Sequence, residues 1–431
     1  MSPVPPSRRG ACPAFLAPME TGDGLVLRLF PADGALTFAQ LSGIAQAARV
    51  LGNGMMEVTA RGSLQVRGLR AETVEPLRER IIALGVTPRL GHAIDLSPLS
   101  GLDPTEMADA RPLARRIRDG ISGLEERFGP KVSVVIDGGG AISLDGRKAD
   151  VRLKARRGQG DAVWTVAVGG GPAVFGSGAE AAEHAVHALT RLAALGRRAR
   201  STDLPGCGDT TDAIDTPPAP PLGRIPLADT TFAFGIGLPF GAGEAALFAA
   251  LAAAAETAGA RDLRPAPERT LLATGLHATG VEAFAAAAEQ LGCIVAPKDP
   301  RAFVAACPGA PACASAHFPA RELAPQVASV LAPLLDGTVS VHLSACTKGC
   351  AHPAPTTLAF VGMDCGVALV HEGAPSKATG PARPVEQLVE ELRALAATPR
   401  AAGETGRDLI RRIDAARLWA RRDQMQSTIG T

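Results

Sequence analysis

Two short stretches near the C-terminal end, ACPGAPAC (residues 306–313) and ACTKGC (residues 345–350), carry four of the eight cysteines of this chain. Their spacings are C-x5-C and C-x3-C, so each stretch presents two thiols from one loop. Two such loops, separated by a helix-length segment, supply the four thiolates that a cubane iron–sulfur cluster requires. The alternative is four ordinary buried cysteines, because a free Cys often acts as a small core hydrophobe. The glycines and prolines between the thiols favour the cluster.

Length, charge and hydropathy exclude several classes of protein. The 431 residues exceed the size at which single cores stop growing, about 250–300 residues, so more than one domain is expected. A net charge of +1 lacks the basic bias of nucleic-acid-binding proteins. The longest apolar stretch, residues 245–255, is far shorter than the roughly 20 residues that cross a bilayer. We therefore expect neither a nucleic-acid partner nor a membrane span.

The N-terminus and the cysteines together predict a cytoplasmic protein. No apolar segment follows Arg8 and Arg9, so a secretory signal is not expected. Without such a signal, the cysteines of a chain this long are expected to stay reduced in the cytosol. Reduced thiols suit a metal cluster better than a disulfide framework.

The first 90 residues have the pattern of a ferredoxin-like unit. Residues 24–30 alternate like a strand, residues 37–51 have helical spacing, and residues 56–69 indicate one or two strands. A second helix is expected over residues 73–84, where Gly85 ends it. This order, β-α-β-β-α, is typical of a ferredoxin-like arrangement.

The same unit recurs later in the chain. Three short matches share an offset of 207 residues: Gly-Leu at 68 and 275, Leu-Gly at 84 and 291, and Val-Ser-Val at 132 and 339. We interpret them as a duplication of a two-part unit, with cysteines in the second copy alone. The expected boundaries are a first half-domain at 1–90, a first copy of the site domain at 91–202, a linker at 203–226, a second half-domain at 227–296, a cluster domain at 297–383 and a helical tail at 384–431.

The chain resembles the sulfite/nitrite reductase superfamily. The resemblance rests on the C-x5-C and C-x3-C pairs, on the duplication, and on VTARGSLQVRGL (residues 58–69). It implies an α+β fold in which a duplicated ferredoxin-like half-domain accompanies an α/β domain of the sirohaem and iron–sulfur type. It also implies a [4Fe–4S] cluster held by Cys307, Cys313, Cys346 and Cys350, with Cys350 nearest a tetrapyrrole. Arg61 and Gln65 would face the same cavity.

Within that superfamily the sequence is most similar to the precorrin-3B synthase branch of aerobic cobalamin biosynthesis. The opening at residues 8–25, the short length and SPLSGLDP (residues 97–104) carry this likeness. The branch takes the tetrapyrrole, precorrin-3A, as substrate and hydroxylates it at C20 with O2, with γ-lactone formation from the ring A acetate. It implies a monooxygenase with a cluster, a possible mononuclear non-haem iron, and an electron donor, NADH or a redox protein.

Departures from the reductase pattern separate the alternatives. Reductases carry an Arg shortly before the SPLSGLDP-like loop and a Lys-x-Lys pair on a later strand; here HAID (residues 92–95) and Lys131 with Ser133 stand there. Reduction of a small anion needs fixed cations around it. A sirohaem-dependent sulfite or nitrite reductase is therefore disfavoured, and sirohaem is the less expected cofactor. A non-catalytic electron-transfer or tetrapyrrole-carrier protein is a second alternative.

Basic side chains are the expected ligands of the tetrapyrrole carboxylates, because the planar fork of Arg binds a carboxylate in bidentate fashion. Arg61 and Arg67, six residues apart on a predicted strand, are expected on one face. Candidate substrate-binding residues are Arg61, Gln65, Arg67, Lys131 and Arg28. No catalytic acid or base is assigned, and no ligands are assigned to a second iron.

Overall fold

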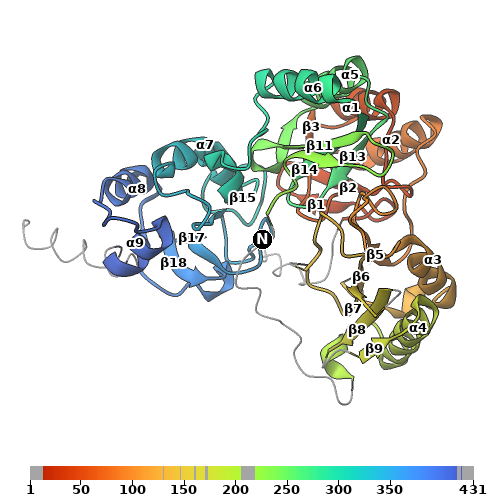
Figure 1. Cartoon of the computed structure of the whole chain (residues 1–431). Coiled ribbons are helices and arrows are strands. Elements are labelled where there is room, and N and C mark those ends of the chain that lie inside the picture. Colours follow the sequence, from red (N-terminus) through yellow and green to blue (C-terminus); the bar gives the residue numbers. More distant parts are fainter. Residues whose placement is uncertain are drawn as a thin grey trace, which may run out of the picture.

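The computed structural model describes residues 13–129, 131–145, 147–159, 162–169, 173–204, 219–414 and 419. Residues 1–12, most of the predicted linker (205–218) and the end of the predicted tail lie outside the described residues. Described helices and strands form two ferredoxin-like halves and two α/β units (Figure 1).

The first half forms a five-stranded sheet covered by two helices. Its strands lie in the order β1 (Met19–Thr21), β2 (Gly24–Leu29), β4 (Leu64–Leu69), β3 (Met55–Val58) and β12 (Ala242–Glu244). The helices are α1 (Phe38–Leu51) and α2 (Ala71–Ala83). Thr37 begins α1 with a capping box, because its side chain accepts from the Gln40 N–H while the Gln40 side chain accepts from the Thr37 N–H. The predicted order β-α-β-β-α is confirmed.

The second half repeats the first. Its strands lie in the order β10 (Gly223–Pro226), β11 (Phe232–Gly237), β14 (Thr270–Leu276) and β13 (Asp262–Ala266), with helices α5 (Ala245–Thr257) and α6 (Ala278–Gln290). Helices α2 and α6 begin at 71 and 278 and end at 83 and 290, so both ends keep the offset of 207 residues. Residues 223–226, which we placed in the linker, form β10 and pair with β11.

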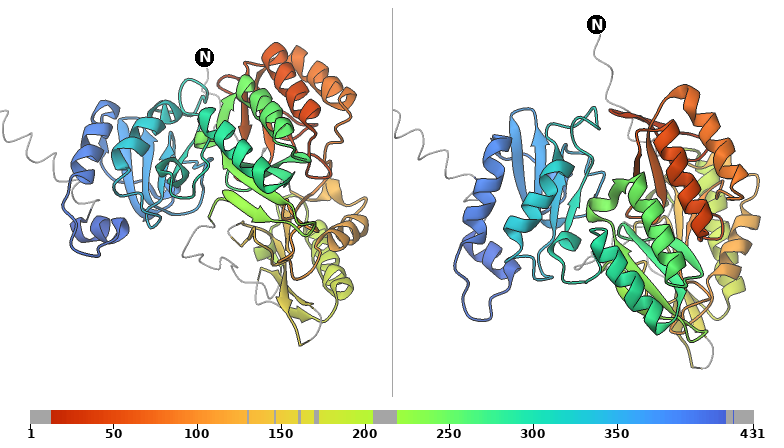
Figure 2. Two further views of the ribbon diagram at one scale, coloured as in Figure 1. Left: turned by 45° about the horizontal axis from the view of Figure 1, so that its top comes forward. Right: turned by 90° about the horizontal axis from the view of Figure 1, so that it is seen from above.

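One hydrophobic core joins the two halves. Buried side chains of α1, such as Leu41 and Ile44, belong to the same cluster as Phe248 and Leu251 of α5. The helices of both halves form one layer over the two sheets (Figures 1 and 2). Strand β12 of the second half pairs with β3 of the first, which ties the halves together through backbone hydrogen bonds as well.

The two α/β units share one topology. The first has strands β5 (Ala93–Asp95), β6 (Ser133–Asp137), β7 (Val151–Arg157), β8 (Ala162–Val168) and β9 (Ala173–Phe175), with helices α3 (Arg111–Gly120) and α4 (Gly178–Leu195). The second has β15 (Val304–Ala306), β16 (Val341–Ser344), β17 (Thr356–Met363), β18 (Gly366–Gly373) and β19 (Ala382–Arg383), with helices α7 (Ala320–Leu331), α8 (Leu388–Ala396) and α9 (Gly406–Ile413). In each sheet three parallel strands are followed by two antiparallel ones. The duplication therefore extends over both parts of the unit.

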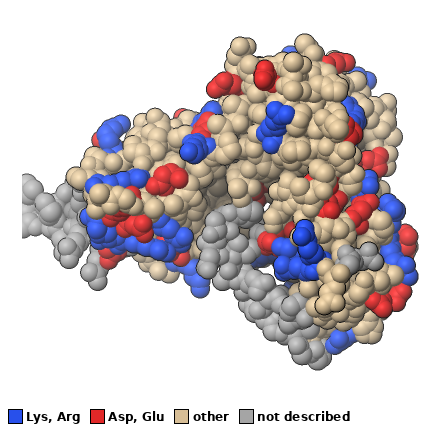
Figure 3. Space-filling view, viewed as in Figure 1, with Lys and Arg blue, Asp and Glu red and all other residues tan. Residues whose placement is uncertain are grey.

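The second α/β unit forms a lobe of its own (Figure 1). Helices α8 and α9, from the predicted helical tail, pack on it through buried Leu388, Leu392, Leu409 and Ile410. A hollow separates this lobe from the rest of the molecule in Figure 3, where acidic and basic side chains are interspersed over the visible face. Among the described residues, no helix has the length and apolar character needed to cross a bilayer.

The β3–β4 and β13–β14 turns meet where the two halves join. Arg61 and Pro267 form an isolated antiparallel bridge, and the Glu268 N–H donates to the Ala60 carbonyl at 3.0 Å. Gly62 has φ +71°, and a Cβ added there would lie 2.8 Å from the carbonyl carbon of Ala266. A glycine is therefore required both by the left-handed backbone and by the close approach of the other turn.

Gly62→Ala should destabilise the protein more than Gly34→Ala. Gly34 has nearly the same φ, +70°, with nothing within 4 Å of an added Cβ, so its replacement costs only the left-handed backbone, about 1–2 kcal/mol. Gly62→Ala adds the clash between the turns, about 1–3 kcal/mol more. Thermal unfolding of both variants checks this, and equal losses would contradict the close packing of the two turns.

Candidate iron–sulfur and substrate site

The two cysteine loops converge because they follow neighbouring parallel strands. Cys307 comes directly after β15 and Cys346 two residues after β16, and these strands pair in parallel. The carboxyl ends of parallel strands lie at the same edge of a sheet. The Cys307 N–H donates to the Leu343 carbonyl at 3.1 Å, and the Ala345 N–H donates to Cys307 Sγ at 3.2 Å.

All four thiols share one electrostatic environment. Burial, and then the nearby Cys346 and Cys313, raise the pKa of Cys307. Cys350 is exposed as a residue, yet desolvation of its thiol and the other three cysteines raise its pKa. Lys348 joins the two loops by donating to Ser315 Oγ at 2.8 Å. The topology thus brings together the four predicted ligands.

The four thiols have the chemistry that an iron–sulfur cluster requires. A cubane cluster bonds each thiolate to a different iron, so its ligands surround it instead of converging on one point. Within the described ranges, no three or more His, Cys, Asp or Glu side chains are placed to hold one ion. The donor set, four thiols from two loops at one sheet edge, fits a [4Fe–4S] cluster.

The first half presents a polar row across its sheet. Gln65 on β4 is the register partner of Arg28 on β2 and of Glu57 on β3. With its amide oriented to match these neighbours, Gln65 donates to Glu57 at 2.8 Å and accepts from Arg28 at 2.9 and 3.0 Å. Leu64 and Val66, which alternate with Gln65, face the core. Arg28 and Gln65 therefore lie in one hydrogen-bonded group.

Arg67, two residues further along β4, contacts the first cysteine loop of the second α/β unit, which we call the cysteine lobe. Its guanidinium binds Asp23 in bidentate fashion at 2.9 and 2.6 Å and donates to the Ala312 carbonyl at 3.1 Å. Burial opposes its charge, but Glu57 and Asp23 outweigh that effect and raise the pKa of Arg67. These contacts engage the guanidinium with protein partners.

Arg61 does not lie on the strand that carries Arg67. It occupies the β3–β4 turn, because β4 begins only at Leu64, and the expectation of a shared strand face for the two arginines is wrong. A turn interrupts the alternation on which that expectation depended. The Arg61 Nε donates to Asp95 Oδ2 at 3.0 Å, and its side chain stays 39% exposed.

Asp95 gathers three arginines at the end of β5. The carboxylate is 3% exposed and lies 3.0 Å from Arg61, 3.2 Å from Arg89 and 3.2 Å from Arg147. Burial alone would raise its pKa, but Arg147, Arg61 and Arg89 outweigh burial and lower it. Asp95 is therefore a fixed anion that holds Arg61 in place between the first half and the first α/β unit.

The β13–β14 turn adds a second charged pair that sequence reasoning missed. Glu268 stands 207 residues after Arg61, and both Glu268 (φ 56°) and Arg269 (φ 64°) have left-handed backbones. Burial raises the pKa of Glu268 against the opposing charges of Arg269 and Arg147. Arg269 donates to the Ala351 carbonyl, next to Cys350. Only the repeat offset in the sequence could have pointed to this turn.

Comparison with known proteins identifies the family. Residues 17–84 match the nitrite/sulfite reductase ferredoxin-like half domain. A precorrin-3B synthase from Sinorhizobium sp is 36% identical over 438 residues, which cover 97% of this chain and 95% of that protein. The chain belongs to the precorrin-3B synthase family. As a member of this family it is an enzyme, an oxidoreductase.

Nitrite reductases match shorter parts of this chain. A ferredoxin–nitrite reductase from Leptolyngbya laminosa is 31% identical over 114 residues, 25% of this chain and 22% of that protein. The structure of the Mycobacterium tuberculosis NirA protein matches with a TM-score of 0.68 and 18% identity, over 91% of this chain and 84% of that one. This likeness confirms the predicted sulfite/nitrite reductase-like fold.

Two histidines of the second α/β unit, His342 and the half-buried His352, lie close to each other. His342 on β16 is fully buried, and both its ring nitrogens and His352 Nε2 lack hydrogen-bond partners among the described residues. Their ring centroids are 6.0 Å apart. Burial, then His352 and Arg269, lower the pKa of His342 to about 3, so the ring is neutral at pH 7. Among the described residues no third His, Cys, Asp or Glu is placed to share a metal ion with them, so we assign no ligands to a second iron.

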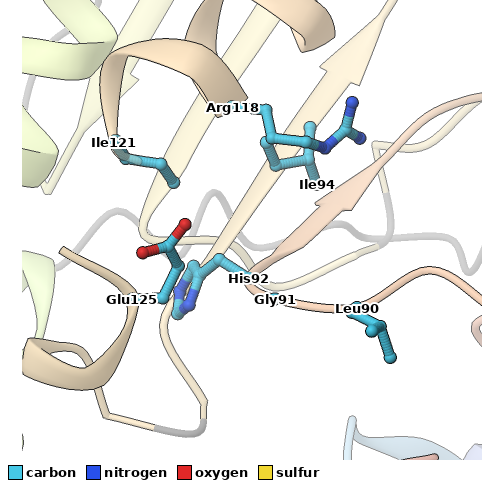
Figure 4. Close-up of a pocket in the computed structure, with 7 residues that line it drawn as sticks. All are labelled: Leu90, Gly91, His92, Ile94, Arg118, Ile121 and Glu125. Atoms are coloured by element: carbon cyan, nitrogen blue, oxygen red, sulfur yellow. The ribbon is translucent and has the colours of Figure 1, made fainter. Parts of the chain in front are cut away.

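Lys131, the last of the predicted substrate-binding residues, belongs to the first α/β unit, whereas the four cysteines belong to the second. Lys131 is exposed just before β6. A pocket of about 210 Å³ borders His92, where the His92 ring and Glu125 lie side by side while Arg118 points away (Figure 4). His92 packs on Phe128, with 4.6 Å between ring centroids, and burial lowers its pKa. This pocket contains none of the predicted site residues.

Proposed function

We propose that this protein converts precorrin-3A to precorrin-3B in cobalamin biosynthesis, by O2-dependent hydroxylation at C20 with γ-lactone formation. Family membership over 97% of the chain carries the proposal. The substrate is then a tetrapyrrole, and its acetate and propionate carboxylates require fixed cations. Arg61 and Lys131 keep exposed side chains, and Arg28 lies in the polar row of the first sheet.

The cluster is the second part of the proposal. Cys307, Cys313, Cys346 and Cys350 would hold a [4Fe–4S] cluster, which supplies one-electron transfer when bound. Hydroxylation inserts one atom of O2 into the substrate and reduces the other to water, which consumes two electrons and two protons. The electrons come from an external donor, NADH or a redox protein. The described cysteines form no disulfide with one another, which fits a cytoplasmic location.

The residues of the chain position the substrate. Arg61 is oriented by Asp95 yet 39% exposed, so its guanidinium retains an accessible edge for a substrate carboxylate. The Glu268 N–H donates to the Ala60 carbonyl, so Glu268 belongs to the turn that meets the Arg61 turn. Burial raises the pKa of its carboxyl group, which allows that group to hold a proton nearer to neutral pH. Ser133, at the second position of the reductase Lys-x-Lys pair, is buried and its N–H donates to Asp150 at 3.1 Å. No cation takes that position.

Incubation of the purified protein with precorrin-3A, a reductant and ¹⁸O₂ should give precorrin-3B that contains one ¹⁸O atom. Mass spectrometry of the product measures the label, and unlabelled O2 with H₂¹⁸O serves as the control for exchange. Absence of ¹⁸O from the product would refute the proposed reaction. It would then favour a carrier or electron-transfer role.

An absorption spectrum of the purified protein tests the alternative cofactor. The broad absorption of an iron–sulfur cluster is expected without strong Soret and Q bands. Stoichiometric sirohaem bands would instead favour a sulfite or nitrite reductase, and nitrite reductases are among the shorter matches of this chain.

A further inference from the structure

One side chain of the first half supports a cysteine loop of the opposite lobe. Arg67 is 4% exposed and donates to the Ala312 carbonyl at 3.1 Å, and the same peptide group carries the N–H of Cys313. Asp23 holds the guanidinium in a bidentate pair at 2.9 and 2.6 Å. The orientation of Arg67 is therefore set before it meets the loop, so little side-chain entropy is lost in that contact.

The turn that carries Asp23 packs directly against the same loop. A Cβ added at Gly22 would lie 2.7 Å from the Ala314 nitrogen, 2.8 Å from the Pro311 oxygen and 2.9 Å from the Cys313 carbonyl carbon. The β1–β2 turn thus touches the backbone on both sides of Ala312. A pocket of about 500 Å³ opens beside this contact, lined by Arg67, Asp23 and residues of the loop.

The charged side chains around this contact form a chain of ion pairs of alternating sign. Arg67 lies 3.6 Å from Glu57 as well as binding Asp23, and Arg321 of α7 binds Glu57 at 2.5 Å. Arg67 thus belongs to a chain of ion pairs behind the loop, and its guanidinium donates to the Ala312 carbonyl of that loop. Side-chain exposures of 5% for Arg67, 15% for Asp23 and 10% for Glu57 mean that solvent screens these charges weakly.

We propose that Arg67 is a positioning residue for the iron–sulfur cluster: it fixes the loop before Cys313 and sets the cluster's reduction potential by its charge. The inference rests on the proposed cluster and differs from the substrate-binding role expected from the sequence. The potential of such a cluster depends on nearby net charge, on hydrogen bonds and on solvent exposure. A fixed positive charge favours the more negative, reduced cluster. Loss of that charge should make the cluster harder to reduce.

Two substitutions of opposite sign test this in the cluster-loaded protein. Arg67→Gln removes a positive charge and should lower the reduction potential, whereas Asp23→Asn removes a negative charge and should raise it. Asn retains an oxygen that accepts from Arg67, and Arg67→Lys keeps the charge as a matched control with a smaller shift. Redox titration followed by electron paramagnetic resonance measures the potential, and iron and sulfide content are measured in parallel.

The outcomes are separable from those of the proposed function. Shifts of the same sign in Arg67→Gln and Asp23→Asn, or no shift in either, would overturn the electrostatic role of Arg67. Should Arg67→Gln lose its cluster, a raised potential in Asp23→Asn with wild-type iron content supports the proposal, and an unchanged potential overturns it. Failure of the proposed cluster itself would appear earlier, as wild-type protein without iron and sulfide.

Discussion

Cys346→Ala is expected to abolish the proposed iron–sulfur cluster and, with it, the proposed hydroxylation of precorrin-3A. Cys346 lies two residues after β16, where the edge of the sheet brings it beside Cys307. A missing thiolate leaves one iron of a cubane with an open position, which exposes the cluster to solvent and oxidative loss. Iron and acid-labile sulfide should fall to a small fraction of the wild-type content, and the broad visible absorption should disappear.

Cys365→Ala is the matched control, because Cys365 is a free, exposed cysteine of the same lobe outside the two loops. It should retain wild-type iron, sulfide and absorption. Full iron and sulfide in Cys346→Ala would show that the ligand set is wrong. Loss of the cluster in both variants would point to general instability of the lobe.

Among substitutions of single charged residues in the site, Asp95→Ala is expected to lower the free energy of unfolding most. Asp95 is 3% exposed and pairs with Arg61, Arg89 and Arg147, of which Arg147 is only 9% exposed. Removal of the carboxylate leaves mutually repelling guanidinium groups without their anion. Breaking a buried pair in this way costs about 3–5 kcal/mol.

Denaturant unfolding of Asp95→Ala measures this loss, with Glu72→Ala as the control. Glu72 pairs with Arg70 at the surface, where the side chains are 69% and 68% exposed, so little change is expected. Equal losses in the two variants would contradict a buried network. The pKa of Asp95 is lowered in the folded protein, so its stabilisation is present above the pKa of an unfolded aspartate and is lost as pH falls through the folded value. At neutral pH the aspartate is ionised in the folded and the unfolded protein, so the full difference in unfolding free energy between Asp95→Ala and wild type should be measured there.

Some features could be predicted because they depend on local pattern. The spacing of the four cysteines indicated two loops, and their convergence follows from parallel pairing of β15 with β16. The offset of 207 residues indicated a duplication, and α2 and α6 preserve it at both ends because the chain between equivalent elements has equal length in the two copies. The β-α-β-β-α order followed from hydrophobic periodicity alone.

The arginines show where such reasoning stops. Alternation placed Arg61 and Arg67 on one face of a strand, but a turn at Gly62 lies between them. Arg61 therefore leaves that face and its side chain donates to Asp95. The partner of a long side chain depends on which helices and strands pack beside it. The hydrophobic periodicity of a single segment does not determine those neighbours. Ala312, the loop partner of Arg67, stands 245 residues away along the chain.

What the sequence by itself determined is therefore the set of cysteines, the duplicated fold and the resemblance to a family. The tertiary structure alone decided that Arg67 contacts a cysteine loop, that Asp95 organises three arginines, and that the turn with Glu268 meets the turn with Arg61. The physical reason is that thiol spacing and apolar periodicity act within a segment, whereas buried charges must find partners among whichever segments the fold brings together.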